Sequence, residues 1–460
     1  MLSFLLWSLL GILFGAIILY FGTLAIVFIL ALPVFYLSVR ALHDGGGKII
    51  PLLGQLRWWH GAWIALFLSG LVFRIRETDE AVSTPLDFWA VYRMGLVFLV
   101  AIALLYRLVM RQPDWLPSLT RGGVGLLAGY AGLGICSTLW SVYPAWTFYK
   151  GVEYLVDIVL VAAIVSSLKT LKDWKLLFNM TWVLYGGLLG TILIGAILWS
   201  DKAVKYGVGL LGVQIQGVVP FVASNGVGEL GAIIGAVALV RLVTREHDKH
   251  FYLTVLCFGL GMLILAQTRS ALLGFLVAAL LILVLVKRLG FMVLLAGFLF
   301  MVVSFGSVGD LIWSYILRGQ NPELFASLSG RTQWWQFGWD LFIQRPLTGY
   351  GAYAGSRFAA LADAGTETTS SIHNTWLEAL LGVGIFGFLL LLVGCLSIWK
   401  CFLSSHGTPS NERVMSALTL EAMSVFAVLS VRSCFTSGLI WHPSLPFLLV
   451  LGYAEFIRRK

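Results

Sequence analysis

Charged residues are scarce in this sequence. Asp, Glu, Lys and Arg make up 12% of the 460 residues, whereas hydrophobic residues make up 59% and the mean hydropathy is +0.91. A soluble globular domain carries about twice that share of charge. The composition therefore excludes a soluble globular protein and predicts an all-α, polytopic integral membrane protein.

Other absences narrow the function. The five cysteines show neither zinc-binding spacing nor a disulfide framework, and no clustered carboxylates are present to hold a metal. No stacked aromatic-basic motif accompanies the net charge of +9, so we expect no nucleic-acid partner. Met1–Leu19 lacks a basic leading region and an A-x-A-like cleavage site, so we interpret it as a first spanning helix. We expect no metal and no cofactor.

Apolar runs long enough to cross a bilayer, about 20 residues each, recur along the chain. They lie near 2–21, 22–42, 58–75, 88–110, 122–141, 148–168, 174–199, 221–244, 251–267, 269–287, 290–307, 372–399, 414–437 and 442–457. We expect about 12–14 transmembrane helices. The expected domains are N-terminal helices at 1–110, central helices at 111–306, a large loop at 307–371 and C-terminal helices at 372–460.

The basic residues predict the orientation. About two thirds of the 31 lysines and arginines fall in connections on one side of the expected spans. By the positive-inside rule that side is cytoplasmic, and both termini lie there. The long 307–371 connection then faces the periplasm of a bacterial inner membrane.

That connection has the composition of an ordered segment. "GRTQWWQFGWDLF" (330–342) places Trp335 and Trp339 one helical turn apart, which favours an amphipathic interfacial helix. "RPLTGYGAYAGS" (345–356) follows and indicates an ordered, turn-rich segment.

Ionisable groups inside or at the ends of spans are candidate functional residues. Arg269 could hold a phosphate or diphosphate bidentately, or reach toward lipid headgroups. Lys150 shares a helical face with Glu153 and Asp157, which suits either a site or an internal ion-pair network. Asn225 lies near a helix start that could bind an anion or pack tightly through glycines.

His373 lies where the loop becomes the next span. A lone histidine there is often structural, but its ordinary pKa near neutrality makes His373 the best available general base. Asn374 and Glu378 follow and share one helical face. By the charge count, Arg269, Lys150, Asn225, Arg331 and His373 all fall on the outer side.

Several stretches together resemble the O-antigen ligase and polymerase superfamily of bacterial envelope glycosyltransferases. "HNTWLEALLGVGIFG" matches the ligase pattern of His, then Asn, Ser or Gln, nine residues, Gly, two residues and Gly. The segments "GRTQWWQFGWDLFIQRPLTGYG" and "QTRSALLGFLVAALLIL" are similar to the loop before that histidine and to an arginine-bearing helix start. "LWSVYPAWTFYKGVEYL" also looks familial, with Lys150 where a basic residue is common.

The resemblance implies a GT-C-type fold and a metal-independent, inverting glycosyltransferase. Its donor would be a glycan on undecaprenyl diphosphate, and its acceptor a lipid-linked or glycan hydroxyl such as lipid A-core, among membrane lipids. Arg269 would stabilise the leaving diphosphate and His373 would activate the acceptor. The expected substrate-binding residues are Arg331, Lys150, Asn225, Gln214, Asn374 and Trp335.

One position departs from the family pattern. Gln214 stands where the resemblance leads us to expect an arginine, before "GVVP". Another cation would then have to help bind the diphosphate, and the candidates are Arg331, Lys150 and Lys205.

Other functions remain open at this stage. One is an O-antigen or exopolysaccharide polymerase of the same superfamily, and another is a lipid or polysaccharide transporter without covalent chemistry. A transporter would favour charges near the membrane midplane. A cell-wall polymerase of the shape-and-division type would need a loop aspartate, for which Asp310, Asp340 and Asp363 are candidates.

Overall fold

The structure is a computed structural model. It describes residues 57–73, 87–110, 115–244, 248–287, 306–361, 371–406, 413–441 and 444–460. The expected spans at 2–21, 22–42 and most of 290–307 lie outside these residues, as does Asp363.

The described chain is mostly helical. Its first half comprises α4 (Trp58–Ser69), α6 (Phe88–Met110), η1 (Leu116–Thr120), α7 (Gly122–Cys136), η2 (Ser137–Trp140), α8 (Pro144–Ser167), α9 (Leu171–Leu198), α10 (Ser200–Ala203), β1 (Val204–Tyr206) and β2 (Val213–Ile215). Its second half comprises α11 (Ser224–Thr244), α12 (Lys249–Ala266), α13 (Arg269–Leu285), α15 (Gly306–Leu317), α16 (Pro322–Ala326), α17 (Arg331–Gln344), the π-helical turn η3 (Ser356–Ala360), α19 (Thr375–His406), α20 (Arg413–Ser433) and α21 (Leu445–Arg459).

Six of these helices are long and apolar enough to cross a membrane, which confirms a polytopic membrane protein. They are Phe88–Met110, Gly122–Trp140, Leu171–Leu198, Ser224–Thr244, Lys249–Ala266 and Thr375–Ser404. The predicted span at 148–168 corresponds to α8, which carries the three charged residues Lys150, Glu153 and Asp157 and is not among these six. Within the described ranges, every other predicted span also has a helix within a few residues of its expected bounds.

Close helix packing depends on small residues. A Cβ atom on Gly231 would lie 2.6 Å from the carbonyl oxygen of Gly259, and one on Gly259 would lie 2.9 Å from the Gly235 nitrogen. The backbones of α11 and α12 can approach this closely only because these positions lack side chains. A buried ion pair between Arg241 on α11 and Glu421 on α20 (2.8 Å) joins α11 to a third helix.

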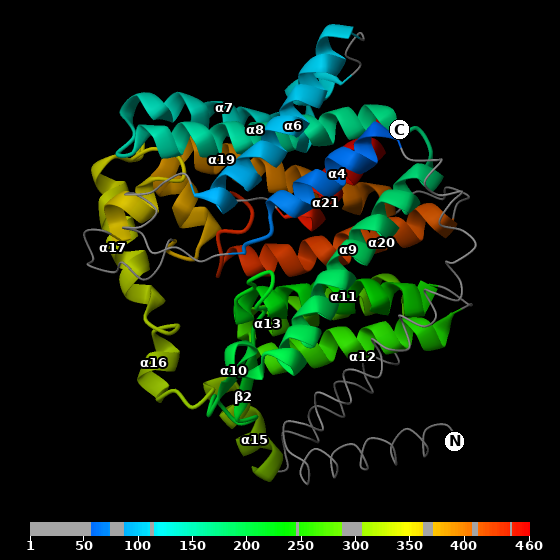
Figure 1. The fold of residues 1–460 in the computed structure, drawn as a ribbon, viewed down its shortest axis with the longest axis vertical. Helices are drawn as coiled ribbons and strands as arrows, with labels where there is room; N and C mark the ends of the chain where they lie inside the picture. The colour runs from blue at the N-terminus through cyan, green and yellow to red at the C-terminus, as the bar shows by residue number, and fades with distance from the viewer. Residues whose placement is uncertain are drawn as a thin grey trace.

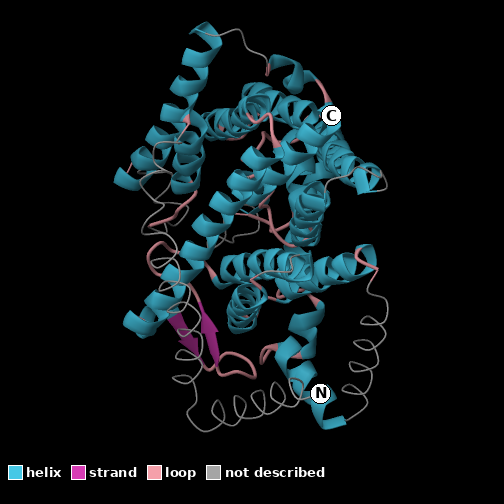
Figure 2. Cartoon of the chain, turned by 90° about the vertical axis from the view of Figure 1, so that its right-hand side faces the viewer, coloured by secondary structure: helices cyan, strands magenta, loops and turns pink. Residues whose placement is uncertain are grey.

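The two ends of the helical bundle carry different elements. Figure 1 shows the long helices crossing the view, with α16 and α17 at the left and the C-terminus at the right. The antiparallel β1–β2 hairpin lies at an edge of the bundle in Figure 2. We call the end that carries α17 and the start of α19 the His373 end.

The segment between α17 and η3 docks into a break in α19. Val383 and Gly384 have non-helical dihedral angles, with φ of +68° at Gly384. The break frees backbone groups, and the loop uses them: the Tyr350 and Gly351 nitrogens donate to the Leu381 and Gly382 carbonyls at 2.7 and 2.9 Å. The turn-rich segment predicted from its glycines is therefore ordered, and it is built into the bundle.

Candidate functional site

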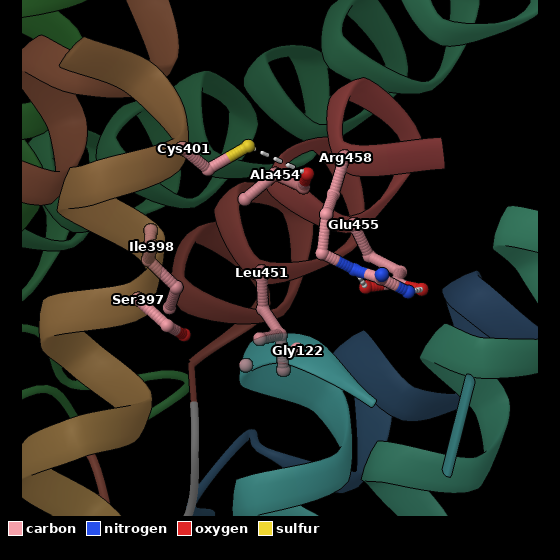
Figure 3. A pocket seen from close by; sticks show the side chains of 9 residues that line it. Gly122, Ser397, Ile398, Cys401, Leu451, Ala454, Glu455 and Arg458 are labelled. Atoms are coloured by element: carbon pink, nitrogen blue, oxygen red, sulfur yellow. Dashed lines mark hydrogen bonds and ion pairs between the residues drawn. The ribbon is translucent and has the colours of Figure 1, made fainter. Parts of the chain in front are cut away.

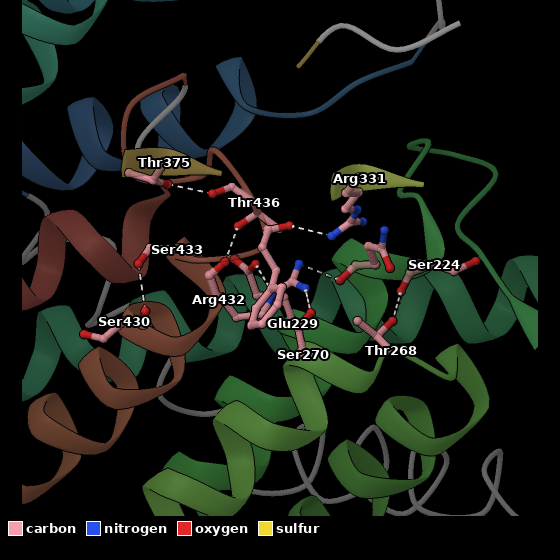
Figure 4. A network of polar contacts seen from close by, with 12 residues as sticks. Ser224, Glu229, Thr268, Ser270, Arg331, Thr375, Ser430, Arg432, Ser433 and Thr436 are labelled. Carbon is pink, nitrogen blue, oxygen red and sulfur yellow. Dashed lines mark hydrogen bonds and ion pairs between the residues drawn. The ribbon is translucent and has the colours of Figure 1, made fainter. Parts of the chain in front are cut away.

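The turn that follows α20, residues 434–437, connects the groups at the His373 end. Its Phe435 carbonyl accepts a hydrogen bond from Arg331 Nη1 at 3.0 Å. Its Thr436 carbonyl accepts from both the backbone nitrogen and the hydroxyl of Thr375, at the start of α19. Figure 4 shows these contacts around Arg432. One turn thus fixes the start of the loop helix relative to the start of the histidine-bearing helix.

Arg432, the last basic residue of α20, draws three helices together. Its guanidinium donates to Glu229 at 2.9 Å, to the Ser270 hydroxyl at 2.6 Å and to the Asn225 carbonyl at 3.1 Å. Only 3% of the residue is exposed. Because Ser270 follows Arg269 directly, this network also positions the start of α13.

Arg269 lies at that helix start and contacts the loop. Its guanidinium donates to the Leu317 carbonyl at 3.3 Å and to the side chain of Gln320, and it lies 5.0 Å from the centre of the Phe325 ring. Gln320 in turn donates to Ser329, two residues before Arg331, at 3.1 Å. These contacts bring Arg269 close to the start of α17.

The positive charges at this end face one another. The pKa of Arg331 is lowered to about 10 by burial and by the charges of Arg432, Arg269 and Arg318. In addition, the Nε atoms of Arg269 and Arg318 are buried without a hydrogen-bond partner among the described residues. Several arginines that repel one another and have unused donors form a site suited to a polyanion.

His373 belongs to the same group of residues. Burial, followed by the charges of Arg331 and Arg432, lowers the pKa of His373 to about 4. Its imidazole lies 6.2 Å from the Trp334 ring, measured between centroids. A histidine with this pKa is neutral at pH 7 and can accept a proton.

The backbone of His373 adopts an uncommon conformation. Its φ is +56°, in the left-handed region that a non-glycine residue rarely occupies. The backbone nitrogen of His373 donates to the Ser371 hydroxyl at 3.0 Å. Such strain costs about 1–3 kcal/mol and persists only where the surroundings impose it.

The two glycines of the His-Asn-x9-Gly-x2-Gly pattern have steric explanations. A Cβ atom on Gly384 would lie 2.3 Å from the Leu347 carbonyl oxygen, and one on Gly387 would lie 1.9 Å from the Val383 side chain. The pattern thus encodes the start of α19, the break and the seat for the 345–351 segment.

Lys150 has a different environment from the arginines. It is 6% exposed and forms an ion pair with Glu153, with its ammonium 5.7 Å from the Trp146 ring centre. This is the internal ion-pair arrangement considered above. Asp157, deeper on the same helical face, pairs with neither Arg93 on α6 nor Arg432 on α20.

Both arginines have other partners in the structure. Arg93 donates to the Ser69 carbonyl at 2.8 Å, and Arg432 pairs with Glu229. The two carboxylate oxygens of Asp157 are buried without a hydrogen-bond partner among the described residues.

Two further predicted residues contact the backbone near His373. Asn374 caps α19, because its side-chain oxygen accepts from the Trp376 and Leu377 nitrogens at 3.0 and 3.1 Å. Trp335 donates from its indole to the Ile372 carbonyl at 2.9 Å.

Gln214 is 5% exposed and donates to the Ala266 carbonyl at 2.9 Å, three residues before Arg269. Its cross-strand neighbour Lys205 is exposed. The remaining candidate, Asn225, contributes its carbonyl to Arg432 as described above.

Sequence reasoning missed four residues at this end. Trp334 lies on α17, where the spacing of Trp335 and Trp339 drew attention to another face of the helix, and Arg318 follows α15 in the same loop. Arg432 lies within the predicted span at 414–437 and was not proposed as a site residue, and Glu378 was noted only as a neighbour on the Asn374 face. The rarity of ionisable groups in spans was the signal that could have identified Arg432 and Glu378.

A small pocket lies near the C-terminus, on different elements. Gly122, Ser397, Cys401 and Leu451 line it together with Glu455 and Arg458 (Figure 3). Glu455 is already paired with Arg458 and Arg459 at 2.7 and 3.1 Å. The residues of the His373 end do not line this pocket. No group of three His, Cys, Asp or Glu side chains arranged for a metal ion occurs in the described ranges.

Comparison with known proteins supplies the family. Residues 253–392 match the family model described as O-antigen ligase. Over these residues the chain is similar to O-antigen ligases. The resemblance drawn from the histidine, arginine and loop motifs is thereby confirmed.

The matched residues include Arg269, Arg318, Arg331 and His373. Lys150, Gln214, Asn225 and Arg432 lie outside the matched residues but within the same bundle. A search of curated proteins gave no match.

Proposed function

We propose that this protein is an O-antigen ligase-like glycosyltransferase. It moves a glycan from undecaprenyl diphosphate to an acceptor hydroxyl, of lipid A-core or a similar glycan, at the periplasmic face of the inner membrane. The full chain would cross the membrane about 12–14 times in a GT-C-type fold, with both termini in the cytoplasm.

One observation supports this proposal most strongly. The charges of Arg269, Arg318 and Arg432 all act on Arg331, and those of Arg331 and Arg432 act on His373. A cluster of cations that can bind a diphosphate, next to a neutral base, is what transfer from a lipid diphosphate requires.

The chemistry then assigns roles. The acceptor oxygen attacks the anomeric carbon from the side opposite the diphosphate, and His373 takes the hydroxyl proton. The bond between that carbon and the diphosphate oxygen breaks, and its electron pair leaves with the diphosphate, so the configuration inverts. Arg269 stabilises the charge that develops on the leaving group. General base catalysis contributes typically about 10²–10⁴-fold to the rate.

The cations that complement Arg269 would be Arg331 and Arg318. Arg331 was one of the three candidates for the cation that compensates for Gln214, and Arg318 adds a second. Lys150 is less suited because it is buried against Glu153, and Lys205 is exposed on the hairpin. Trp334 and Trp335 on α17 would cover the donor sugar and hold the peptide before His373.

A reconstituted assay tests this function. Purified protein in liposomes receives undecaprenyl-diphosphate-linked glycan and acceptor, and the glycosylated product is measured. We expect His373→Ala and Arg269→Ala each to reduce the transfer rate by about 100-fold or more.

The matched controls are His250→Ala at the start of α12 and Arg121→Ala before α7, both exposed. These controls should retain wild-type transfer. Full activity in His373→Ala would refute the mechanism.

A deletion strain distinguishes the ligase from a polymerase of the same superfamily. Loss of a ligase leaves long lipid-linked polymer that is not joined to the acceptor. Loss of a polymerase leaves single repeat units, and gel electrophoresis of the glycolipids separates the two patterns.

A further inference from the structure

Within the part of the chain that the structure describes, the buried carboxylate of Glu378 accepts four hydrogen bonds. Oε1 accepts from the Ile372 nitrogen at 3.0 Å and from the Ser437 hydroxyl at 3.1 Å. Oε2 accepts from the Trp441 indole at 3.0 Å and from the Ser356 hydroxyl. Only 4% of the residue is exposed. The carboxylate therefore joins η3, the peptide before His373 and the connection between α20 and α21.

The four donors differ in their freedom. The Ile372 amide and the Trp441 indole can only donate, whereas the hydroxyls of Ser356 and Ser437 can rotate and either donate or accept. Each carboxylate oxygen thus faces one obligate donor and one adaptable group.

The contacts of Glu378 reach His373 along two routes. The first is direct, through the amide of Ile372, whose carbonyl is held on its other side by the Trp335 indole. The second is a relay. The His373 nitrogen donates to Ser371, whose hydroxyl lies 2.7 Å from that of Ser437, which donates to Glu378.

These contacts account for the strained backbone at the histidine. A φ of +56° at a non-glycine residue is unfavourable unless neighbouring groups impose it. Both polar groups of the Ile372 residue and the nitrogen of His373 have fixed partners, so the peptide has little freedom to relax.

We propose that Glu378 is a positioning residue. Its carboxylate holds the 371–373 peptide in the conformation that directs the His373 imidazole toward Arg331 and Arg432. The consequence for transfer rests on the proposed function, but the position of the imidazole can be measured without any substrate.

Glu378→Gln is the informative substitution because it preserves shape and changes one acceptor into a donor. If the amide nitrogen takes the Oε1 place, it opposes the Ile372 N–H. If it takes the Oε2 place, it opposes the Trp441 indole N–H. Either orientation sets two donors against each other, so the clamp around His373 loosens.

The structure also indicates a rescue. Trp441→Phe removes the obligate donor at Oε2 and leaves the adaptable Ser356 hydroxyl, which can accept from a glutamine amide. In the double variant, the introduced glutamine side chain can keep its oxygen toward the Ile372 amide and Ser437. The double variant should therefore restore the wild-type position of His373.

The measurement is hydrogen–deuterium exchange at the imidazole C2 position, followed by mass spectrometry on the purified full chain in detergent. The midpoint of the exchange rate against pH gives the pKa of each histidine. Among the described residues, the charges that act on His373 are those of Arg331 on α17 and of Arg432 on α20, and Arg432 is itself paired with Glu229.

The wild-type midpoint should lie near pH 4. In Glu378→Gln it should rise by about one unit or more toward the ordinary value of about 6.5, as the ring moves away from burial and the arginines. Trp441→Phe alone should leave it near wild type, and the double variant should return to the wild-type midpoint. The exposed His250 provides an internal reference that should not shift.

An unchanged His373 midpoint in folded Glu378→Gln would overturn the proposal, as would a double variant that is not restored. Should Glu378→Gln not fold, Ser437→Ala removes the relay and the direct Ser437 hydrogen bond to Oε1, leaves the Ile372 contact in place, and must also raise the midpoint. An unchanged value there counts against the proposal.

The transfer assay separates this proposal from the function itself. If the protein is not a transferase, the His373 midpoint still responds to Glu378. If only the positioning role is wrong, His373→Ala is inactive while Glu378→Gln keeps wild-type turnover.

Discussion

At the scale of single residues, the arginines at the His373 end lower the pKa of the His373 imidazole, and this effect can be measured. After burial, the charge of Arg331 lowers the pKa of His373 most. Replacing it with a neutral residue should therefore raise that pKa, because the protonated imidazole no longer faces this guanidinium. Arg331→Gln is predicted to shift the exchange midpoint of His373 upward.

The control for this prediction is Arg345→Gln, at the exposed end of the same loop helix. Arg345 lies 4.7 Å from the Tyr350 ring centre and is absent from the charges that act on His373. Its substitution should leave the midpoint unchanged. Equal shifts in the two variants would contradict a specific effect of Arg331.

The same histidine gives stability a defined pH dependence. Its pKa is about 4 when folded and near 6.5 when unfolded. Between these values the unfolded chain binds a proton that the folded chain does not, so the free energy of unfolding decreases as the pH falls from about 6.5 to 4.

His373→Gln removes this contribution. The melting temperature of each purified protein is measured at pH 7 and at pH 5. Its decrease from pH 7 to pH 5 should therefore be smaller for the variant than for the wild type. Parallel decreases would show that His373 does not titrate in this window.

At the scale of elements, the break in α19 is the feature that joins the loop to the bundle. Gly384→Ala places a Cβ 2.3 Å from the Leu347 carbonyl oxygen at a φ of +68°. We expect it to destabilise the protein by about 1–3 kcal/mol and to displace the 345–351 segment. Melting temperature and protease sensitivity of the loop measure these effects.

Gly190→Ala is the matched control for that substitution. Gly190 lies within α9, and a Cβ there would have nothing within 4 Å. Alanine is the better helix former, so this change should be neutral or mildly stabilising. Equal destabilisation by both substitutions would mean that the break is not a specific docking site.

The sequence predicted elements better than their connections. The apolar run at 88–110 predicted both ends of α6, because a membrane span is a long and uniformly apolar stretch of sequence. The pattern His-Asn-x9-Gly-x2-Gly also identified two glycines that proved essential sterically. It could not reveal that Gly384 lies against the 345–351 segment, since that contact joins distant segments through backbone groups.

The candidate site was only partly predictable for a related reason. His373, Arg269 and Arg331 stood out by residue type at helix starts or in the loop. Glu378 and Arg432 required the fold, because their importance comes from partners such as Ile372 and Glu229 that are far away or unremarkable in sequence. Lys150 shows the converse, since its residue type suggested substrate binding and the fold pairs it with Glu153.

At the scale of the whole molecule, the proposal requires the His373 end to face the periplasm. Gln336 is exposed on α17, and Lys169 is exposed between α8 and α9. In a variant without its five native cysteines, Gln336→Cys should react with a membrane-impermeant maleimide on intact spheroplasts. Lys169→Cys should react only after permeabilisation, and the reverse pattern would overturn the orientation.

The proposed mechanism depends most on one role of His373: it must promote transfer of the glycan after the lipid-linked donor is bound. The direct measurement uses protein purified with its lipid-linked glycan, to which acceptor is added, with mass spectrometry of the lipid fraction over time. The wild type should consume the bound donor. His373→Ala should be purified with the same amount of bound donor but should consume it at least about 100-fold more slowly. Donor consumption by His373→Ala at the wild-type rate would contradict the account.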